Sequence, residues 1–366
     1  MKRSLPVKPK RIVVKVGSAI LTSRNYRLNK AWIKKLVAQI AALIDKNTEV
    51  ILVTSGAIAA GMGMLRLDSR PKLLPQQQAA AAIGQSQLMR IYDTFFRHYG
   101  QLSAQVLLTR DDLSNRKRYL NAKNTLFTLL SYNVVPIINE NDTVSVDEIK
   151  FGDNDRLSAL VAALGQADLL VILSDVDGLY AERNVISVVE RISPEIERLA
   201  SAATGRVGTG GMASKVEAAK ICCATGLGCI VANGKTPGIL SRILDEQDIG
   251  TLFLPRKEQL VAKKRWIGFG AKVAGKLFVD EGAKQALTLK KKSLLAKGIV
   301  GLGGTFAVGD MVSILDIKNQ EFARGLVSYS SEELAKIKGQ KSERIETLLG
   351  YKYYDEVVHR DNLVIL

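Results

Sequence analysis

The sequence predicts an α/β protein: a mainly parallel open sheet sandwiched by helices, followed by a small β-barrel-like domain. Up to about residue 255, short β-branched apolar runs alternate with segments that carry apolar residues at helical spacing. This alternation is typical of a parallel sheet that is covered on both faces. After Pro255 the chain changes to short strands separated by glycine-rich turns, which favours a small β-structure.

The predicted strands of the first part are nearly continuous apolar runs. They cover residues 11–16, 49–53, 106–108, 134–138, 169–173 and 229–232. Runs with helical spacing or helix-like composition lie between them, at residues 30–44, from Ile58 onward, at 195–206 and at 216–223. Because the strands are apolar on both faces, we expect helices on both sides of the sheet.

In the second part, strands are predicted at residues 275–279, 297–300, 311–315 and 321–327, before a helical stretch at 332–350. A basic stretch, Lys263-Lys264-Arg265-Trp266, precedes these strands. We therefore divide the chain into a first domain, a basic linker, a small β-domain and a tail, at residues 1–258, 259–274, 275–350 and 351–366.

Composition excludes several classes of protein. The chain has 366 residues and a formal net charge of +16, which suits polyanionic small molecules at least as well as nucleic acid. Its apolar runs are too short to cross a membrane. The three cysteines, Cys222, Cys223 and Cys229, are an odd number, which favours a reducing, cytoplasmic compartment and buried structural thiols. With two histidines, chemistry based on a histidine base or a histidine-rich metal site is not expected.

Polar and glycine-rich motifs follow five of the predicted strands. In open parallel sheets ligands bind at the carboxyl ends of the strands, so these motifs should meet in one cleft. Turn chemistry alone would place some of these residue types there, but five such loops favour a shared site. They are Gly17-Ser18, Thr54-Ser55-Gly56, Asn139-Glu140-Asn141-Asp142, Ser174-Asp175 and Asn233-Gly234.

A glycine-rich segment, residues 208–215, precedes the helical run at 216–223. Glycines let the backbone approach phosphate oxygens, and the free N–H groups at a helix start favour an anion. Lys215 is unfavourable for the helix dipole at this position, which indicates an anion beside it. The alternative is a flexible surface loop. Neither a Walker A loop at Gly234-Lys235-Thr236 nor a dinucleotide fingerprint at 208–213 has the required spacing or context.

Lys15 lies within an otherwise apolar predicted strand. A buried lysine is costly unless an anion is paired with it. The segment 139–155 offers partners. The alternative for Lys15 is an edge or end position where its ammonium group reaches water. The alternative for the segment is an ordinary solvated loop. The possible partners are Asp142, Asp153, Asn154 and Asp155.

Taken in order, the motifs resemble the amino-acid kinase family with a C-terminal PUA domain, and within it the enzymes that phosphorylate free glutamate. The resemblance covers nearly the whole chain and implies the amino-acid kinase fold followed by a PUA-like domain. It rests on residues 13–18, 53–61, 139–142, 152–155, 175–180 and 208–215, with 349–351 and 359–361 near the C-terminus.

The resemblance also implies roles for individual residues. Lys15 and Lys215 would be catalytic, contacting the transferring phosphoryl group of ATP, and Asp155 would hold both lysines in position. The substrate would be bound by Ser55, Asp142 and Asn154. ATP would be bound by Lys15, Ser174, Asp175, Thr209, Gly210, Gly211, Met212, Ala213, Ser214 and Lys215.

The reaction implied is ATP-dependent phosphorylation of the side-chain carboxylate of L-glutamate to L-glutamyl 5-phosphate, the first step of proline biosynthesis. Mg²⁺ would enter with ATP, without a metal site built from protein ligands. L-Proline is implied as feedback inhibitor, and the enzyme as a homo-oligomer. The residues agree with this chemistry, because a glutamate carboxylate with a pKa of about 4.3 is already ionised and needs no general base.

Other readings use the same features. Acetylglutamate kinase, aspartokinase and uridylate kinase share the cleft but lack this Asn-Glu-Asn-Asp context. From another class, an RNA-binding or RNA-modification factor would use the PUA domain, where a basic stripe runs from Lys284 to Lys297. We favour a kinase over an RNA-binding factor, because the motifs occur in the context that a kinase requires.

Overall fold

The computed structural model describes residues 3–23, 27–145, 154–202, 211–255, 273–352 and 354–366. Predictions that concern Asp153, Thr209, Gly210 and the linker segment 256–272 lie outside these residues. The chain forms two compact units, the first mostly from residues 1–259 and the second mostly from residues 260–366. The exact domain boundaries stay a prediction.

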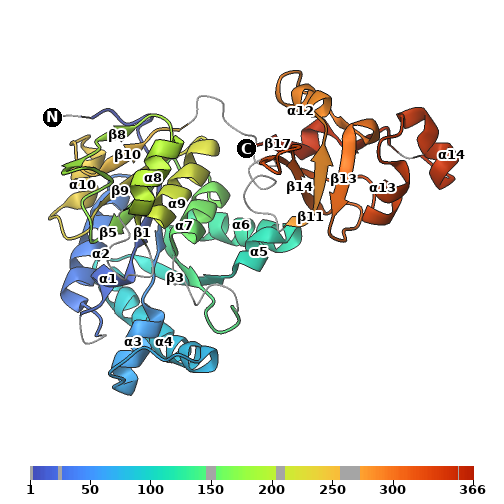
Figure 1. Cartoon of the computed structure of the whole chain (residues 1–366). Coiled ribbons are helices and arrows are strands. Elements are labelled where there is room, and N and C mark those ends of the chain that lie inside the picture. The colour runs from blue at the N-terminus through green and yellow to red at the C-terminus, as the bar shows by residue number, and fades with distance from the viewer. Residues whose placement is uncertain (1–2, 24–26, 146–153, 203–210, 256–272, 353) are drawn as a thin grey trace. The chain divides into compact units, whose positions relative to one another are not determined.

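The first unit is built on one eight-stranded sheet (Figure 1). Neighbouring strands are parallel from β3 to β9, whereas β10 runs antiparallel to β9 and pairs with β8 in parallel. The predicted, mainly parallel sheet is therefore confirmed. In hydrogen-bonded order the strands are β3 (Leu102–Leu108), β4 (Val134–Glu140), β2 (Glu49–Val53), β1 (Arg11–Val16), β5 (Leu169–Ser174), β9 (Gly228–Asn233), β10 (Thr251–Phe253) and β8 (Val188–Val189).

Helices cover both faces of this sheet. Apolar residues of α2, α4 and α10 share one core cluster with residues of the sheet. On the other face α7 packs against β1 and β5, and α9 lies between α7 and α8 (Figure 1). The helices are α1 (Ser18–Leu21), α2 (Lys30–Ile44), α3 (Ala57–Leu65), α4 (Leu74–His98), α5 (Arg110–Ser114), α6 (Arg116–Ser131), α7 (Asn154–Leu164), α8 (Pro194–Ala202), α9 (Met212–Ala224) and α10 (Ile239–Leu244), with a small hairpin of β6 (Tyr180–Ala181) and β7 (Asn184–Val185).

The direction of each side chain in β1 follows from the alternation of a strand. Ile12, Val14 and Val16 belong to the core cluster beneath α2 and α4. Successive side chains of a strand point to opposite faces, so Val13 and Lys15 face the side of α7. Strand β1 lies inside the sheet, between β2 and β5, and Lys15 is buried. The alternative that places this lysine at a sheet edge is therefore wrong.

Helices α3 and α4 approach each other closely at two glycines. A Cβ atom on Gly61 would lie 1.8 Å from the backbone oxygen of Ala80, and one on Gly84 would lie 1.8 Å from that of Ala57. The two contacts are reciprocal, one from each helix. They fix α4 against the helix that follows β2, while Leu88, Tyr92 and Phe96 of α4 enter the core of the sheet.

The second unit contains a five-stranded sheet in the order β13, β11, β14, β15, β17. The order begins at β13 and ends at β17, and these two edge strands are not paired with each other. The described residues therefore form an open sheet and not a closed barrel. The predicted strand at 297–300 begins later than expected, because residues 296–298 form the 3₁₀ turn η2. The strands are β11 (Val273–Val279), β13 (Ile299–Gly303), β14 (Met311–Leu315), β15 (Glu321–Leu326) and β17 (Leu363–Ile365), and β12 (Leu294–Leu295) pairs separately with β16 (Glu356–Val358).

Short capped helices complete this second core. The Asp280 side chain accepts a hydrogen bond from the backbone N–H of Ala283 at the start of α12. A capping box of Ser330 and Glu333 begins α13, which satisfies donors that a helix start leaves open. The helical elements are α12 (Glu281–Thr288), η2 (Ala296–Gly298), α13 (Ser331–Ile337), η3 (Ser342–Arg344), α14 (Ile345–Leu349) and η4 (Arg360–Asn362).

Two sequence-based expectations concern the whole chain. Within the ranges described, no helix is long and apolar enough to cross a membrane. Cys222, Cys223 and Cys229 are buried on α9 and β9, as predicted for structural residues. Burial raises the pKa of the Cys229 thiol well above its usual range, with a further contribution from its hydrogen bond to Cys222.

Replacing Gly84 by alanine tests the contact between α3 and α4. By helix propensity alone, Gly→Ala within a helix should stabilise by about 0.5–1 kcal/mol. The close backbone contact should outweigh this, because overpacking costs about 1–3 kcal/mol. We expect Gly84→Ala to lower the free energy of unfolding in urea titrations. Gln76→Ala, at an exposed position of α4, should change it by less than about 0.5 kcal/mol. Equal stability of the wild type and Gly84→Ala would contradict the close contact.

Candidate active site

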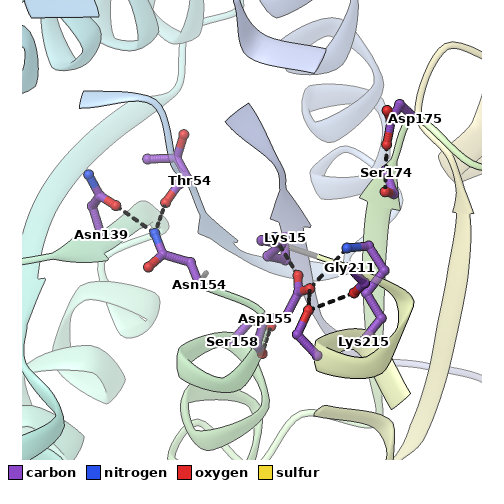
Figure 2. A network of polar contacts seen from close by, with 11 residues as sticks. Lys15, Thr54, Asn139, Asn154, Asp155, Ser158, Ser174, Asp175, Gly211 and Lys215 are labelled. Carbon is purple, nitrogen blue, oxygen red and sulfur yellow. Dashed lines mark hydrogen bonds and ion pairs between the residues drawn. The ribbon is translucent and has the colours of Figure 1, made fainter. Parts of the chain in front are cut away.

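The five polar motifs predicted to meet do so at one edge of the sheet. They stand at the carboxyl ends of β4, β2, β1, β5 and β9, which are neighbours in that order and parallel. This edge is where open parallel sheets bind ligands. The starts of α7 and α9 bring Asn154, Asp155 and Lys215 to the same place, as Figure 2 shows.

Asp155 is the centre of a buried cluster of charged groups (Figure 2). Its carboxylate forms an ion pair with Lys15 of β1, and Lys215 Nζ of α9 lies 3.1 Å from Oδ2. The hydroxyl of Ser214 donates to the same Oδ2 over 2.9 Å. Asp155 is 0% exposed and each lysine is 4% exposed. The prediction that Asp155 could pair with these lysines is thus met in the geometry, and a solvated loop at this residue is excluded.

The cluster contains more positive than negative charge. Two ammonium groups share one carboxylate, so these three side chains carry a formal charge of +1 in a water-poor place. Buried charges are costly unless they are paired. Two buried ammonium groups held this close together can both form charge-assisted hydrogen bonds to one phosphate group.

Local structure explains the positions of Asp155, Lys215 and Ser214. Asp155 lies in the first turn of α7, where a carboxylate interacts favourably with the helix dipole. Lys215 lies in the first turn of α9, after Gly211 as N-cap, where a cation is unfavourable. The pairing with Asp155 offsets that cost. Ser214 of α9 connects the two helices through its hydrogen bond to Asp155, and its single hydroxyl hydrogen is shared with the backbone oxygen of Gly211, 2.8 Å away.

A second buried network holds Asn154, which was predicted to bind substrate. Its amide nitrogen donates to the backbone oxygen of Thr54 over 2.5 Å and to Asn139 Oδ1 over 2.7 Å. The hydroxyls of Thr54 and Tyr92 lie 3.0 Å apart and share a hydrogen bond. Sequence reasoning named Asn139 within a motif but gave it no role, and it missed Tyr92. The one available signal was the polar Asn139 at the end of an apolar strand.

Ser55 and Asp142 complete the predicted substrate-binding set at the carboxyl ends of β2 and β4. The buried hydroxyl of Ser55 has no hydrogen-bond partner among the residues that are described. Burial raises the pKa of the Asp142 carboxyl to about 6, although the charge of Arg70 acts in the opposite direction. Both groups are therefore poised to gain stability when a polar ligand binds.

The predicted nucleotide-binding residues flank the lysine cluster. The hydroxyl of Ser174 at the end of β5 donates to Asp175 Oδ1 over 3.2 Å. At the start of α9 stand Gly211, Met212, Ala213 and Ser214. Sequence reasoning included the neighbouring Asp177 in the motif 175–180 but gave it no role. Its carboxylate accepts from Asn233 over 2.9 Å and from the Tyr180 hydroxyl over 2.8 Å. These hydrogen bonds lower the pKa of Asp177 and raise that of Tyr180.

The fold and this site are those of a phosphate-handling α/β protein, and comparison with known families agrees. Residues 10–233 match the model of the amino acid kinase family, and residues 275–349 match that of the PUA domain. The chain belongs to the amino acid kinase family.

Curated relatives narrow the comparison. The chain is 54% identical over 363 residues to the glutamate 5-kinase of Thermoanaerobacter sp. (strain X514), covering 97% of this chain and 98% of the relative. It is 56% identical over 363 residues to the glutamate 5-kinase of Caldanaerobacter subterraneus subsp. tengcongensis, with the same coverage. It is 51% identical over 372 residues to that of Syntrophotalea carbinolica, covering 100% of both chains.

One solved structure, the UMP kinase from Bacillus anthracis, is 14% identical to this chain. It superposes with a TM-score of 0.46 and covers 69% of this chain and 99% of that one. The similarity is too weak to support a statement about fold or activity.

Removing either lysine tests the charge cluster. Lys15→Met and Lys215→Met keep the length and apolar stem of each side chain, so both variants should fold. If each ammonium stabilises charge that develops in the transition state, kcat for ATP-dependent phosphorylation should fall by about 10²–10³-fold. Lys220→Met is the control, because this exposed lysine of α9 pairs only at the surface with Glu197 and should leave kcat unchanged. A folded Lys15→Met or Lys215→Met enzyme with normal kcat would exclude that lysine from catalysis.

Proposed function

We propose that this chain is an ATP-dependent glutamate 5-kinase, which phosphorylates the side-chain carboxylate of L-glutamate to give L-glutamyl 5-phosphate, the first step of proline biosynthesis. The observation that carries the proposal is the buried pair of lysines held by Asp155 at the ligand-binding edge of the sheet. Relatives of at least 51% identity over nearly the whole chain are glutamate 5-kinases.

The chemistry requires two anions to meet. The acceptor carboxylate is ionised at neutral pH, so the nucleophile needs no general base. The obstacle is the repulsion between this carboxylate and the phosphoryl oxygens. Lys15 and Lys215 would offset the negative charge that spreads over those oxygens in the transition state. Asp155 would act as a positioning residue, holding both ammonium groups so that little reorganisation is needed.

The substrate would be recognised through groups that the fold already holds in place. Asp142 would pair with the α-ammonium group of glutamate, which an N-acetylated substrate lacks. The hydroxyl of Ser55 would donate to a substrate oxygen, which would give this buried group a hydrogen-bond acceptor. Asn154 would contact the substrate through its side-chain amide. ATP would lie beside Ser174, Asp175 and residues 209–215.

Mg²⁺ fits this site as part of the nucleotide complex. Among the residues that the structure describes, no group of three or more histidine, cysteine or acidic side chains could hold a metal ion, and the Asp155 carboxylate is engaged by the lysines and Ser214. Mg²⁺ commonly keeps several waters and binds through substrate phosphates. We therefore propose that phosphate oxygens and water hold it, where it would neutralise part of the phosphate charge.

Regulation, assembly and location form a further part of the proposal. The motif resemblance supports L-proline as feedback inhibitor, a homo-oligomeric enzyme and a cytoplasmic location. The RNA-factor alternative is not favoured, because the relatives that span the entire chain are kinases and not RNA-modifying proteins.

An acceptor screen tests the proposed function. ATP consumption is measured with L-glutamate, N-acetylglutamate, aspartate and uridylate, and hydroxylamine is added to trap acyl phosphate. We expect glutamate-dependent ATP consumption together with hydroxamate formation. Turnover with uridylate, or with N-acetylglutamate in place of glutamate, would overturn the proposal.

The raised pKa of Asp142 predicts a specific pH dependence. The ionised carboxylate is needed to bind the ammonium group, and it is lost as the pH falls through about 6. The kcat/KM for glutamate should therefore decrease below that pH, since this parameter reports groups of the free enzyme. In Asp142→Asn this titration should disappear, and the KM for glutamate should rise at least about 10-fold, because a charge-assisted hydrogen bond is worth about 1.5–3 kcal/mol. The KM for ATP serves as the internal control. An equal rise in both Michaelis constants would instead indicate general disorder of the site.

A further inference from the structure

We infer that Gln85, a residue of α4 with no assigned role, is a positioning residue that holds Asn139, and through it Asn154, in the orientation that binds the substrate. In that orientation Asn154 would present its oxygen, and not its NH₂ group, to the α-ammonium group of glutamate. The inference rests on the proposed function and concerns how its substrate is selected.

The orientation of the Asn154 amide is determined first by the backbone. The carbonyl oxygen of Thr54 can only accept a hydrogen bond, so the nitrogen of Asn154 must face it. The second hydrogen of that nitrogen goes to Asn139 Oδ1 over 2.7 Å. Both donors are then used, and the side-chain oxygen lies apart from both partners in Figure 2. None of the described residues donates a hydrogen bond to that oxygen, so it remains available to a ligand that donates.

Asn139 must turn its oxygen toward the nitrogen of Asn154, which leaves its own nitrogen facing Gln85. Asn139 Nδ2 donates to Gln85 Oε1 over 2.7 Å, a contact between buried side chains. If the Asn139 amide were flipped, two NH₂ groups would face each other at Asn154 and two carbonyl oxygens would face each other at Gln85. Both contacts would then be repulsive, so the oxygen of Gln85 stabilises the orientation of Asn139 that Asn154 requires.

Helix α4 makes this chain rigid. Gln85 and Tyr92 are seven residues apart and therefore lie on the same face of the helix. Gln85 supports Asn139, while Tyr92 shares a hydrogen bond with Thr54. Gly84 beside Gln85 is in close contact with α3, so the helix cannot shift easily. One helix face thus fixes both residues between which the Asn154 amide is held.

The amide nitrogen of Gln85 helps to show which atom of this side chain is important. Its Nε2 is buried and has no hydrogen-bond partner among the described residues. An unsatisfied buried donor is unfavourable, so the amide nitrogen does not explain a glutamine at this position. The amide oxygen explains the glutamine, because that atom accepts a hydrogen bond from Asn139. The result is a substrate edge with two acceptors, Asn154 Oδ1 and the Asp142 carboxylate, which suits an ammonium group and disfavours a carboxylate.

The test compares glutamate with glutarate, which differs only by the missing α-amino group. The KM for glutamate and the inhibition constant of glutarate, competing against glutamate, are measured at pH 8 with the full-length chain. In Gln85→Met the oxygen is lost. We expect the KM for glutamate to rise about 10-fold, the effect of one hydrogen bond to a charged group, while the inhibition constant of glutarate changes little. Equal changes for both ligands, or no change, would overturn the inference.

Two controls separate this role from general packing. Gln85→Glu retains an oxygen that can accept from Asn139 and should preserve the selectivity for glutamate over glutarate. Ser86→Ala changes the exposed neighbour of Gln85 on α4 and should also preserve it. Loss of selectivity in either folded control would contradict the inference. If Gln85→Met does not melt cooperatively, Asn139→Ser takes its place with the same expected loss.

The wild type separates the inference from the proposed function. If it forms no acyl phosphate with glutamate, the proposed function fails. If it does, and Gln85→Met and Asn139→Ser retain its selectivity, only the role of Gln85 fails.

Discussion

The site depends on one buried carboxylate. Asp155 brings together a lysine from a central strand and a lysine from the start of a helix, two cations that would otherwise repel each other in a water-poor interior. Coulomb interactions are much stronger there than in water, so the carboxylate determines where both ammonium groups lie. Both ammonium groups therefore lie close together, where one phosphate group can contact the two of them. Structural pairing and catalytic potential thus come from the same contact.

The substrate side of the site depends on a different principle, the satisfaction of neutral polar groups. Asn154 and Asp155 are consecutive, yet one is held by amides and the other by cations. Helix α4 supports the amides, and its glycine contacts with α3 connect that support to the chain segment that carries Ser55. The start of α7 therefore joins the half of the site that would bind glutamate to the half that would bind phosphate.

Much of this arrangement could be predicted from the sequence. Strand β1, helix α2 and strand β2 have the predicted bounds, because apolar periodicity and strand length are strong signals there. Lys15 and Lys215 stood out because each breaks a local rule, a charge in an apolar strand and a cation at a helix start. Functional residues often show themselves by such local inconsistency.

Other features could not be predicted, for physical reasons. Gln85 and Tyr92 are ordinary residues for a helix, and their importance arises from contacts between positions far apart in the chain, such as the 54 residues that separate Gln85 from Asn139. The open order of the C-terminal sheet likewise depends on long-range pairing of β15 with β17. Local patterns do not contain this information.

The most direct measurement of the central claim is kcat for Asp155→Asn at saturating ATP and glutamate, with cooperative melting confirmed in the presence of ATP. The substitution keeps the size of the side chain but removes the charge that holds both lysines. The account predicts a folded enzyme whose kcat is lower by at least about 10²-fold, the loss that follows when positioned electrostatic stabilisation is removed. A folded Asp155→Asn enzyme with kcat within about threefold of the wild type, a difference below 1 kcal/mol in the activation barrier, would contradict it.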